Sequence, residues 1–109
     1  MKIVFSVISH RQAKIIKNLV VSSENYLKFP KKNFDFKIVK NVHEKLDFNT
    51  KKLKINIIQN SKPKGFGANH NHTFKTEMPD YFFVINPDIV FSKRFCVKSF
   101  IDDMNKKNL

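Results

Sequence analysis

The sequence predicts a single α/β domain over residues 1–109, built on a mainly parallel open sheet with flanking helices, and three observations support this prediction. Short apolar runs rich in β-branched and aromatic residues recur along the chain, as buried strands require. Segments with apolar residues at helical spacing lie between these runs. The 109 residues are 41% hydrophobic, which is enough for one buried core. Because strands alternate with helices, crossover connections should make the sheet parallel.

Four strands are expected from the apolar runs. They span about residues 3–8, 34–39, 53–58 and 81–85. The last run is nearly all aromatic or β-branched, which is typical of a central strand covered on both faces. The first strand is expected near the centre of the sheet. Residues 89–91 are expected to resume the extended chain briefly.

Three helices are expected between and after these strands. The first begins near Gln12 and is closed by Pro30, and a short one runs from about residue 68 to 75, before Pro79. The last should open at Ser92 or Lys93. Its apolar positions would be Phe95, Phe100, Ile101 and Met104.

Polar residues follow every expected strand. Ligands of open parallel sheets bind beyond the carboxyl ends of the strands. The polar residues at these ends are Ser9 and His10, then Asn41, then 60–67, then Asn86 and Asp88. The sequence therefore predicts a binding site along this edge of the sheet.

The two glycines, Gly65 and Gly67, lie between the third strand and the short helix. Glycine lets a ligand approach the backbone closely, and a helix N-terminus offers N–H groups to phosphate, so the loop could contact a diphosphate. Lys62 and Lys64 add positive charge beside it. The alternative is a tight strand-to-helix connection in which glycine only solves a turn. A dinucleotide fingerprint would need a third glycine where His70 stands.

The triplet Asn86-Pro87-Asp88 follows the most strand-like segment. A carboxylate at a strand end can hold Mg²⁺ or Mn²⁺, which prefer oxygen ligands and bridge to diphosphate oxygens. The alternative is an Asx-Pro turn in which Asp88 caps nearby backbone N–H groups.

Taken together, these segments resemble family 2 glycosyltransferases of the GT-A fold, especially the rhamnosyltransferase-like branch. The resemblance rests on Asn60 to Asn71, with its Gly-Phe-Gly, and on Tyr-Phe-Phe-Val-Ile-Asn-Pro-Asp from Tyr81. The opening strand with its Ser-His turn and the segment 39–42 occupy the corresponding places of the family's first two strands. The order and approximate spacing agree over nearly the whole chain.

The resemblance implies a site for a nucleotide-diphosphate sugar. It places Ser9 and the Asn41 region near the base and ribose, and the glycine loop beside the diphosphate. The implied nucleotide-sugar-binding residues are Ser9, Asn41, Lys64, Gly65, Gly67, Asn71 and Asn86. Asp88 corresponds to the metal-binding DXD element and is the implied ligand of Mg²⁺ or Mn²⁺. The chain departs from the family pattern at Lys40, where many relatives are acidic, and at Asn86, which replaces the first DXD carboxylate.

The resemblance also implies sugar transfer in the synthesis of polysaccharide- or lipopolysaccharide-type glycans. In the family, the catalytic base comes from the acceptor-binding half, downstream of the Asn-Pro-Asp strand. This chain ends about twenty residues after Asp88, so we expect the nucleotide-sugar-binding, N-terminal half of a GT-A domain and assign no catalytic residue. A truncated or split gene, a fragment, and a domain that binds without catalysis are the three explanations. If the gene is split, a separately encoded acceptor half would be a partner of this chain.

The formal net charge of +12 suits an anionic partner, although coding bias that scatters lysines over the surface explains it equally well. The alternative function is a basic nucleic-acid-binding module, which ranks lower because no RNP, helix-turn-helix or zinc-finger pattern occurs. Neither a signal peptide nor an apolar stretch near the ~20 residues of a membrane helix is evident. We expect a cytoplasmic protein, with contact to the anionic inner face of the membrane as one option. Cys96 is the single cysteine, so no internal disulfide is expected.

Overall fold

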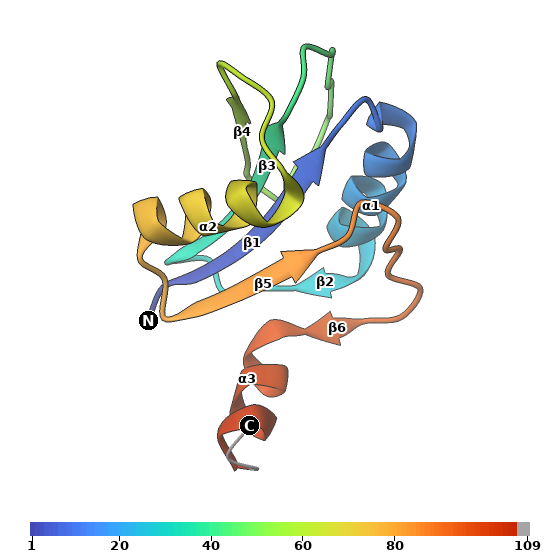
Figure 1. The fold of residues 1–109 in the computed structure, drawn as a ribbon. Coiled ribbons are helices and arrows are strands. Elements are labelled where there is room, and N and C mark those ends of the chain that lie inside the picture. The colour runs from blue at the N-terminus through green and yellow to red at the C-terminus, as the bar shows by residue number, and fades with distance from the viewer. Residues whose placement is uncertain (107–109) are drawn as a thin grey trace.

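The computed structural model describes residues 1–106, and its centre is a four-stranded parallel sheet (Figure 1). The strand order is β4-β3-β1-β5, so β1 lies inside the sheet as expected. The strands are β1 (Ile3–Ser9), β3 (Phe34–Lys40), β4 (Ile55–Gln59) and β5 (Tyr81–Ile85). Every residue of β1 is buried, because the strand has a neighbour on each side and elements packed on both faces.

The two long helices cover opposite faces of the sheet. Helix α1 (Ala13–Tyr26) connects β1 to β3, while α2 (Phe66–Glu77) connects β4 to β5. These two connections run in opposite directions across the sheet, and right-handed crossovers therefore place their helices on opposite faces (Figure 1). The mainly parallel α/β fold predicted from the sequence is confirmed.

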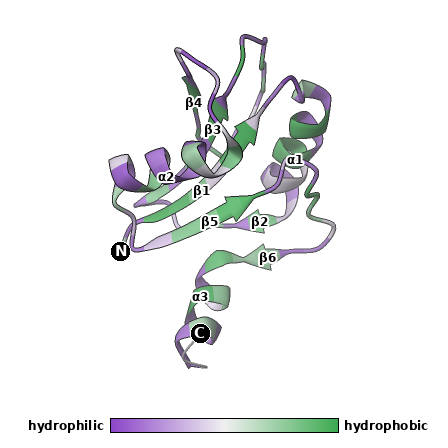
Figure 2. Cartoon of the chain, viewed as in Figure 1, coloured by the Kyte–Doolittle hydropathy of each residue, from purple (hydrophilic) through white to green (hydrophobic). Residues whose placement is uncertain are grey.

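The helices differ in what they turn toward the sheet. Helix α1 buries an apolar stripe that includes Ile16, Leu19 and Val20. Helix α2 instead buries Asn69, His70 and Thr73, and the hydropathy colouring in Figure 2 shows it as the more hydrophilic of the two. The inward face of α2 is therefore held by hydrogen bonds more than by apolar packing.

A second, two-stranded sheet joins distant parts of the chain. Strand β2 (Leu27–Lys28) pairs in parallel with β6 (Phe95–Cys96), and α3 (Val97–Lys106) follows directly. The expectation that the last helix opens at Ser92 or Lys93 is wrong, because Phe95 is recruited into β6. The expected extended segment 89–91 is irregular.

Strand β5 lies at the edge of the main sheet in residues 1–106, so its expected central position is also wrong. Its aromatic residues are covered by helices on either face of the strand. Phe82 packs against Phe74 of α2 with ring centroids 5.4 Å apart, and Phe83 against Phe100 of α3 at 5.7 Å. The apolar run thus reflects two covered faces rather than two neighbouring strands. Within the same residues, no helix is long and apolar enough to cross a membrane.

Candidate functional site

The carboxyl ends of the four parallel strands form one edge of the sheet, which we call the rim. The register pairs Ser9 with Lys40, and Lys40 with Gln59. The chain beyond these ends stays connected, since Asn41 N donates to Ser9 O at 2.8 Å and Asn60 N to Lys40 O at 3.0 Å. The predicted polar rim is therefore present.

Three asparagine side chains meet at the rim and form what we call the asparagine cluster, namely Asn41, Asn60 and Asn69. The buried Asn41 amide is its centre. Asn41 Oδ1 accepts from Asn60 Nδ2 at 3.0 Å and from Asn69 Nδ2 at 3.1 Å. The cluster joins the end of β3, the end of β4 and the first turn of α2.

The asparagine cluster also fixes the loop that leads into α2. Asn41 Oδ1 accepts from Lys64 N at 2.7 Å, and Asn41 Nδ2 donates to Lys64 O at 2.9 Å. Asn69 Nδ2 contacts Gly65 O at 3.2 Å. Lys64 and Gly65 are thus bound through their backbone, while both residues are exposed to solvent.

Neither glycine is required by the turn itself. Gly65 is the N-cap of α2 with φ −68° and ψ 164°, and neither glycine has a positive φ. A Cβ added at Gly65 or Gly67 would meet no atom within 4 Å. The tight-connection alternative therefore lacks its expected geometry. The Gly65 cap makes no side-chain hydrogen bond to the first turn, where helices leave backbone N–H groups without intrahelical partners.

Asn71, which the family resemblance placed on the diphosphate side, is exposed on α2, and Asn69 occupies the inward position instead. Two residues apart on a helix point to roughly opposite sides, so the two cannot exchange roles. The signal that identifies Asn69 is its spacing, because Asn69 and Thr73 are four residues apart and share the buried face of α2.

Ser9 is buried at the end of β1 and is tied to Glu44, a residue that the sequence reasoning missed. Ser9 Oγ donates to Glu44 Oε2 at 2.7 Å, and Arg11 N donates to the same oxygen at 3.0 Å. Glu44 Oε1 is buried without a partner in residues 1–106. The rim therefore has a carboxylate although position 40 is Lys. Glu44 lay in a polar loop with no periodic pattern to mark it.

Asn86 and Asp88 follow β5 at the same rim, because β5 pairs in parallel with β1. Both residues are exposed, and Ile89 N closes the turn on Asn86 O at 3.1 Å. In the described part of the chain, the Asp88 carboxylate makes no hydrogen bond, so the capping alternative is not seen. The same residues contain no group of three or more His, Cys, Asp or Glu that could hold a metal ion. Asp88 thus fits Mg²⁺ or Mn²⁺ only as one ligand among phosphate and water oxygens.

A cavity of about 340 Å³ lies between β4 and α2, next to the asparagine cluster. Its walls include Asn60, Ser61, Lys64 and Asn69, as well as His72 further along α2. The rim therefore offers both an exposed loop and an adjoining hollow with mixed polar and apolar walls.

The parallel sheet with helices on both faces is an α/β fold of the GT-A type. No family model matches the sequence, and no curated protein matches it significantly. Among solved structures, S. aureus TarS 1–349 matches 99% of this chain with a TM-score of 0.72 and 18% identity. The same portion in complex with UDP also matches 99%, with a TM-score of 0.73 and 19% identity. A further S. aureus TarS structure matches 99% of this chain, with a TM-score of 0.73 and 18% identity.

The chain spans only part of these structures. It covers 33% of the TarS 1–349 chain, with or without UDP, and 20% of the further TarS chain. At this level of identity the likeness establishes the fold.

Proposed function

We propose that the chain binds a nucleotide-diphosphate sugar at the rim, as the donor-binding part of a glycosyltransferase. The observation that carries this proposal is the asparagine cluster, in which Asn41 holds the backbone of Lys64 beside the N-terminus of α2. The likeness to a TarS structure in complex with UDP adds support. The family 2, rhamnosyltransferase-like assignment and a role in polysaccharide- or lipopolysaccharide-type glycan synthesis belong to the same proposal.

The rim divides into parts with different chemistry. Ser9 Oγ and Arg11 N hold the carboxylate of Glu44 at the rim, and its second oxygen, Oε1, has no partner in residues 1–106. A free carboxylate oxygen suits the N–H edge of a base or a ribose hydroxyl. The loop from Lys64 to Gly67 offers open backbone beside a helix N-terminus, which suits a diphosphate.

A leaving diphosphate needs positive charge beside it, and the rim has two possible sources of that charge. Lys62 and Lys64 are exposed in the loop before α2. Asp88, with Asn86 beside it, would hold Mg²⁺ or Mn²⁺ at the end of β5, and a bound metal would offset the charge on the departing diphosphate. The proposal also includes an acceptor-binding part, which a separately encoded chain would supply as a partner.

Calorimetric titration with UDP, dTDP and GDP, each with and without Mn²⁺, tests this function. We expect one nucleotide to bind more tightly when Mn²⁺ is present, and Asp88→Ala to abolish that metal-dependent gain. Asp102→Ala is the matched control, because Asp102 is exposed on α3, away from the rim. Single-stranded RNA binding as tightly as UDP, steeply weakened by salt and unaffected by Asp88→Ala, would support the basic-module alternative instead.

A further inference from the structure

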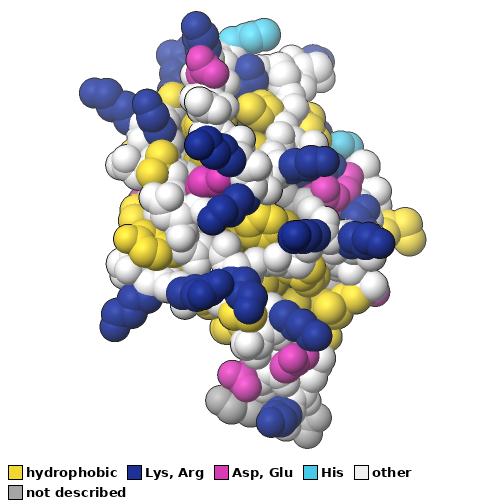
Figure 3. Space-filling model, turned by 180° about the vertical axis from the view of Figure 1, so that it is seen from behind, with side chains coloured by type: hydrophobic (Ala, Val, Ile, Leu, Met, Phe, Trp, Pro, Cys, Tyr) yellow, Lys and Arg dark blue, Asp and Glu magenta, His cyan; other side chains and the backbone are white. Residues whose placement is uncertain are grey.

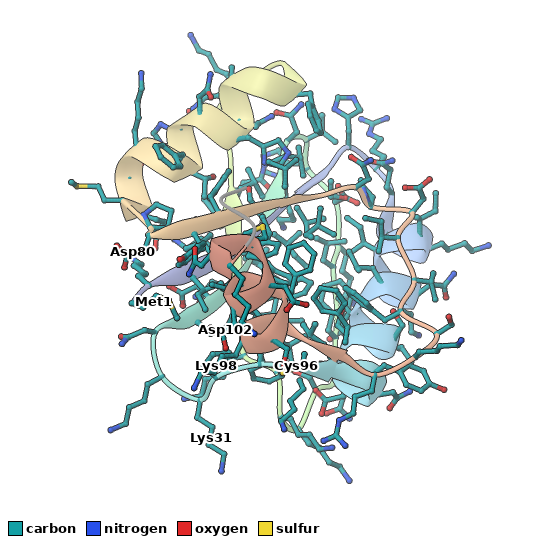
Figure 4. The ribbon with its side chains drawn as sticks, turned by 90° about the horizontal axis from the view of Figure 1, so that it is seen from below. Met1, Lys31, Asp80, Cys96, Lys98 and Asp102 are labelled. Carbon is teal, nitrogen blue, oxygen red and sulfur yellow. The ribbon has the colours of Figure 1, made fainter. Side chains whose placement is uncertain are left out.

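A second and larger cavity, of about 660 Å³, lies at the end of the sheet opposite the rim. It is walled by the last turn of α1, by β2 and the turn after it, by residues 52–54 before β4, and by Arg94 before β6. These segments adjoin the amino ends of β3 and β4, so the cavity is separate from the candidate nucleotide site. Figure 4 views the molecule from below, with Lys31 extending outward from the turn after β2.

The cavity is strongly cationic. Its basic lining residues are Lys28, Lys31, Lys52, Lys54 and Arg94. In residues 1–106 none of these side chains has an ion-pair partner, since the two ion pairs there both involve Glu77. Lys and Arg side chains also outnumber acidic ones on the face shown in Figure 3.

The one carboxylate of this cavity, Glu24, is already bound to the backbone. It accepts hydrogen bonds from Lys51 N at 2.8 Å, Lys52 N at 2.7 Å and Leu53 N at 2.9 Å. Burial opposes the ionisation of Glu24, but these N–H groups more than offset that effect and lower its pKa. Glu24 therefore orders the segment that carries Lys52 and Lys54, and leaves most of the positive charge unbalanced.

The cavity also has aromatic walls. Phe29 and Phe34 stack with ring centroids 5.0 Å apart and planes 22° apart. Phe34 is in turn anchored edge-on against the buried Phe5 at 5.1 Å. Tyr26 is 43% exposed at the end of α1. A flat apolar group can therefore lie against these rings.

From this geometry we infer that the cavity binds a small organic phosphate, with its apolar or aromatic group against Phe29, Phe34 and Tyr26. The phosphate would lie among the five basic side chains, which offer several charge-assisted donors to its oxygens. The volume falls within the range of about 300–1,000 Å³ that suits a single small ligand. An extended nucleic-acid strand would instead need a groove that tracks its backbone.

The first test uses 1-naphthyl phosphate as a probe, with 1-naphthol and inorganic phosphate as partial probes, in ¹⁵N NMR titrations of the chain. We expect shifts of the backbone amides at 24–29, Lys31, 52–54 and Arg94, and at least about fivefold weaker binding of either partial probe. Inorganic phosphate binding as tightly as 1-naphthyl phosphate would overturn the inference, because the aromatic wall would then contribute nothing.

The second test compares two pairs of lysines that carry the same charge. Lys31→Gln/Lys54→Gln should lower the affinity for 1-naphthyl phosphate roughly three- to tenfold, because two partly solvated charge contacts are lost. Lys14→Gln/Lys75→Gln, which changes exposed lysines outside the cavity, should leave the affinity unchanged. An equal loss in both pairs would show attraction to overall charge only and would overturn the inference. An oligouridylate of about ten nucleotides that binds more tightly than 1-naphthyl phosphate and shifts the same backbone amides would also overturn the inference.

Discussion

The side-chain amide of Asn41 binds both backbone polar groups of Lys64, because Oδ1 accepts from Lys64 N at 2.7 Å and Nδ2 donates to Lys64 O at 2.9 Å. Asn41→Ala removes both bonds and also takes away an acceptor shared by Asn60 Nδ2 and Asn69 Nδ2, which keep their bonds to Asn69 Oδ1 and Gly65 O. We expect the free energy of unfolding to fall by about 2 kcal/mol, and the nucleotide affinity to fall as the loop loosens. Urea unfolding and UDP calorimetry measure these two effects. Asn71→Ala should change neither, and equal losses in both variants would contradict the role of the cluster.

The glycines allow stability and binding to be separated. Gly67→Ala should stabilise the chain by about 0.5–1 kcal/mol, because alanine is the better helix former and its Cβ meets no atom within 4 Å. If a diphosphate lies against this backbone, the same methyl group should weaken UDP binding severalfold. Thermal unfolding and calorimetry of one variant check both. A more stable variant with unchanged UDP affinity would show that no ligand approaches the glycine backbone.

His70 should make stability depend on pH. Its Nδ1 lies 2.8 Å from Ser6 Oγ, its Nε2 is buried without a partner in residues 1–106, and burial lowers its pKa. The neutral form is therefore favoured in the folded state. Stability should be independent of His70 above its unfolded pKa of about 6.5, and should decline as the pH falls below it, since the unfolded chain then binds the proton more readily.

Urea unfolding between pH 5 and 8 measures this decline. His70→Gln should flatten it, while His43→Gln, at an exposed position, should leave it in place. A decline that persists in His70→Gln would assign it to another group.

Glu77 holds the end of α2 against Lys2, which precedes β1, and against Lys37 in the middle of β3. It is paired with Lys2 at 3.1 Å and with the nearly buried Lys37. The hydrogen bond from Lys37 is the main cause of its lowered pKa. Glu77→Gln should cost about 3 kcal/mol, because Lys37 would be left without its counter-charge. Lys37→Met/Glu77→Gln should recover much of this loss in urea unfolding, and a larger loss in the double variant would contradict the account.

Much of the fold could be predicted from the sequence because four strands carry continuous apolar runs. Strands β2 and β6 are two residues long, too short for any periodic signal. Helix α2 was placed by its flanking loop and Pro79 rather than by amphipathicity, because its buried face is polar.

The site was partly predictable for a similar reason. Ser9, Asn41, Lys64 and Gly65 follow strand ends, and a parallel sheet must bring such positions to one edge. The positions of the Asn69 and Glu44 side chains depend on which way a helix face or an irregular loop is turned. Hydropathy carries no information on that direction.

A crystal structure of the chain with UDP and Mn²⁺ tests the central claim most directly. The account predicts the diphosphate against the backbone from Lys64 to Gly67, the base beside Ser9 and Glu44, and an anomalous Mn²⁺ peak at Asp88. UDP bound in the basic cavity at the opposite end of the sheet, with an empty rim, would contradict it.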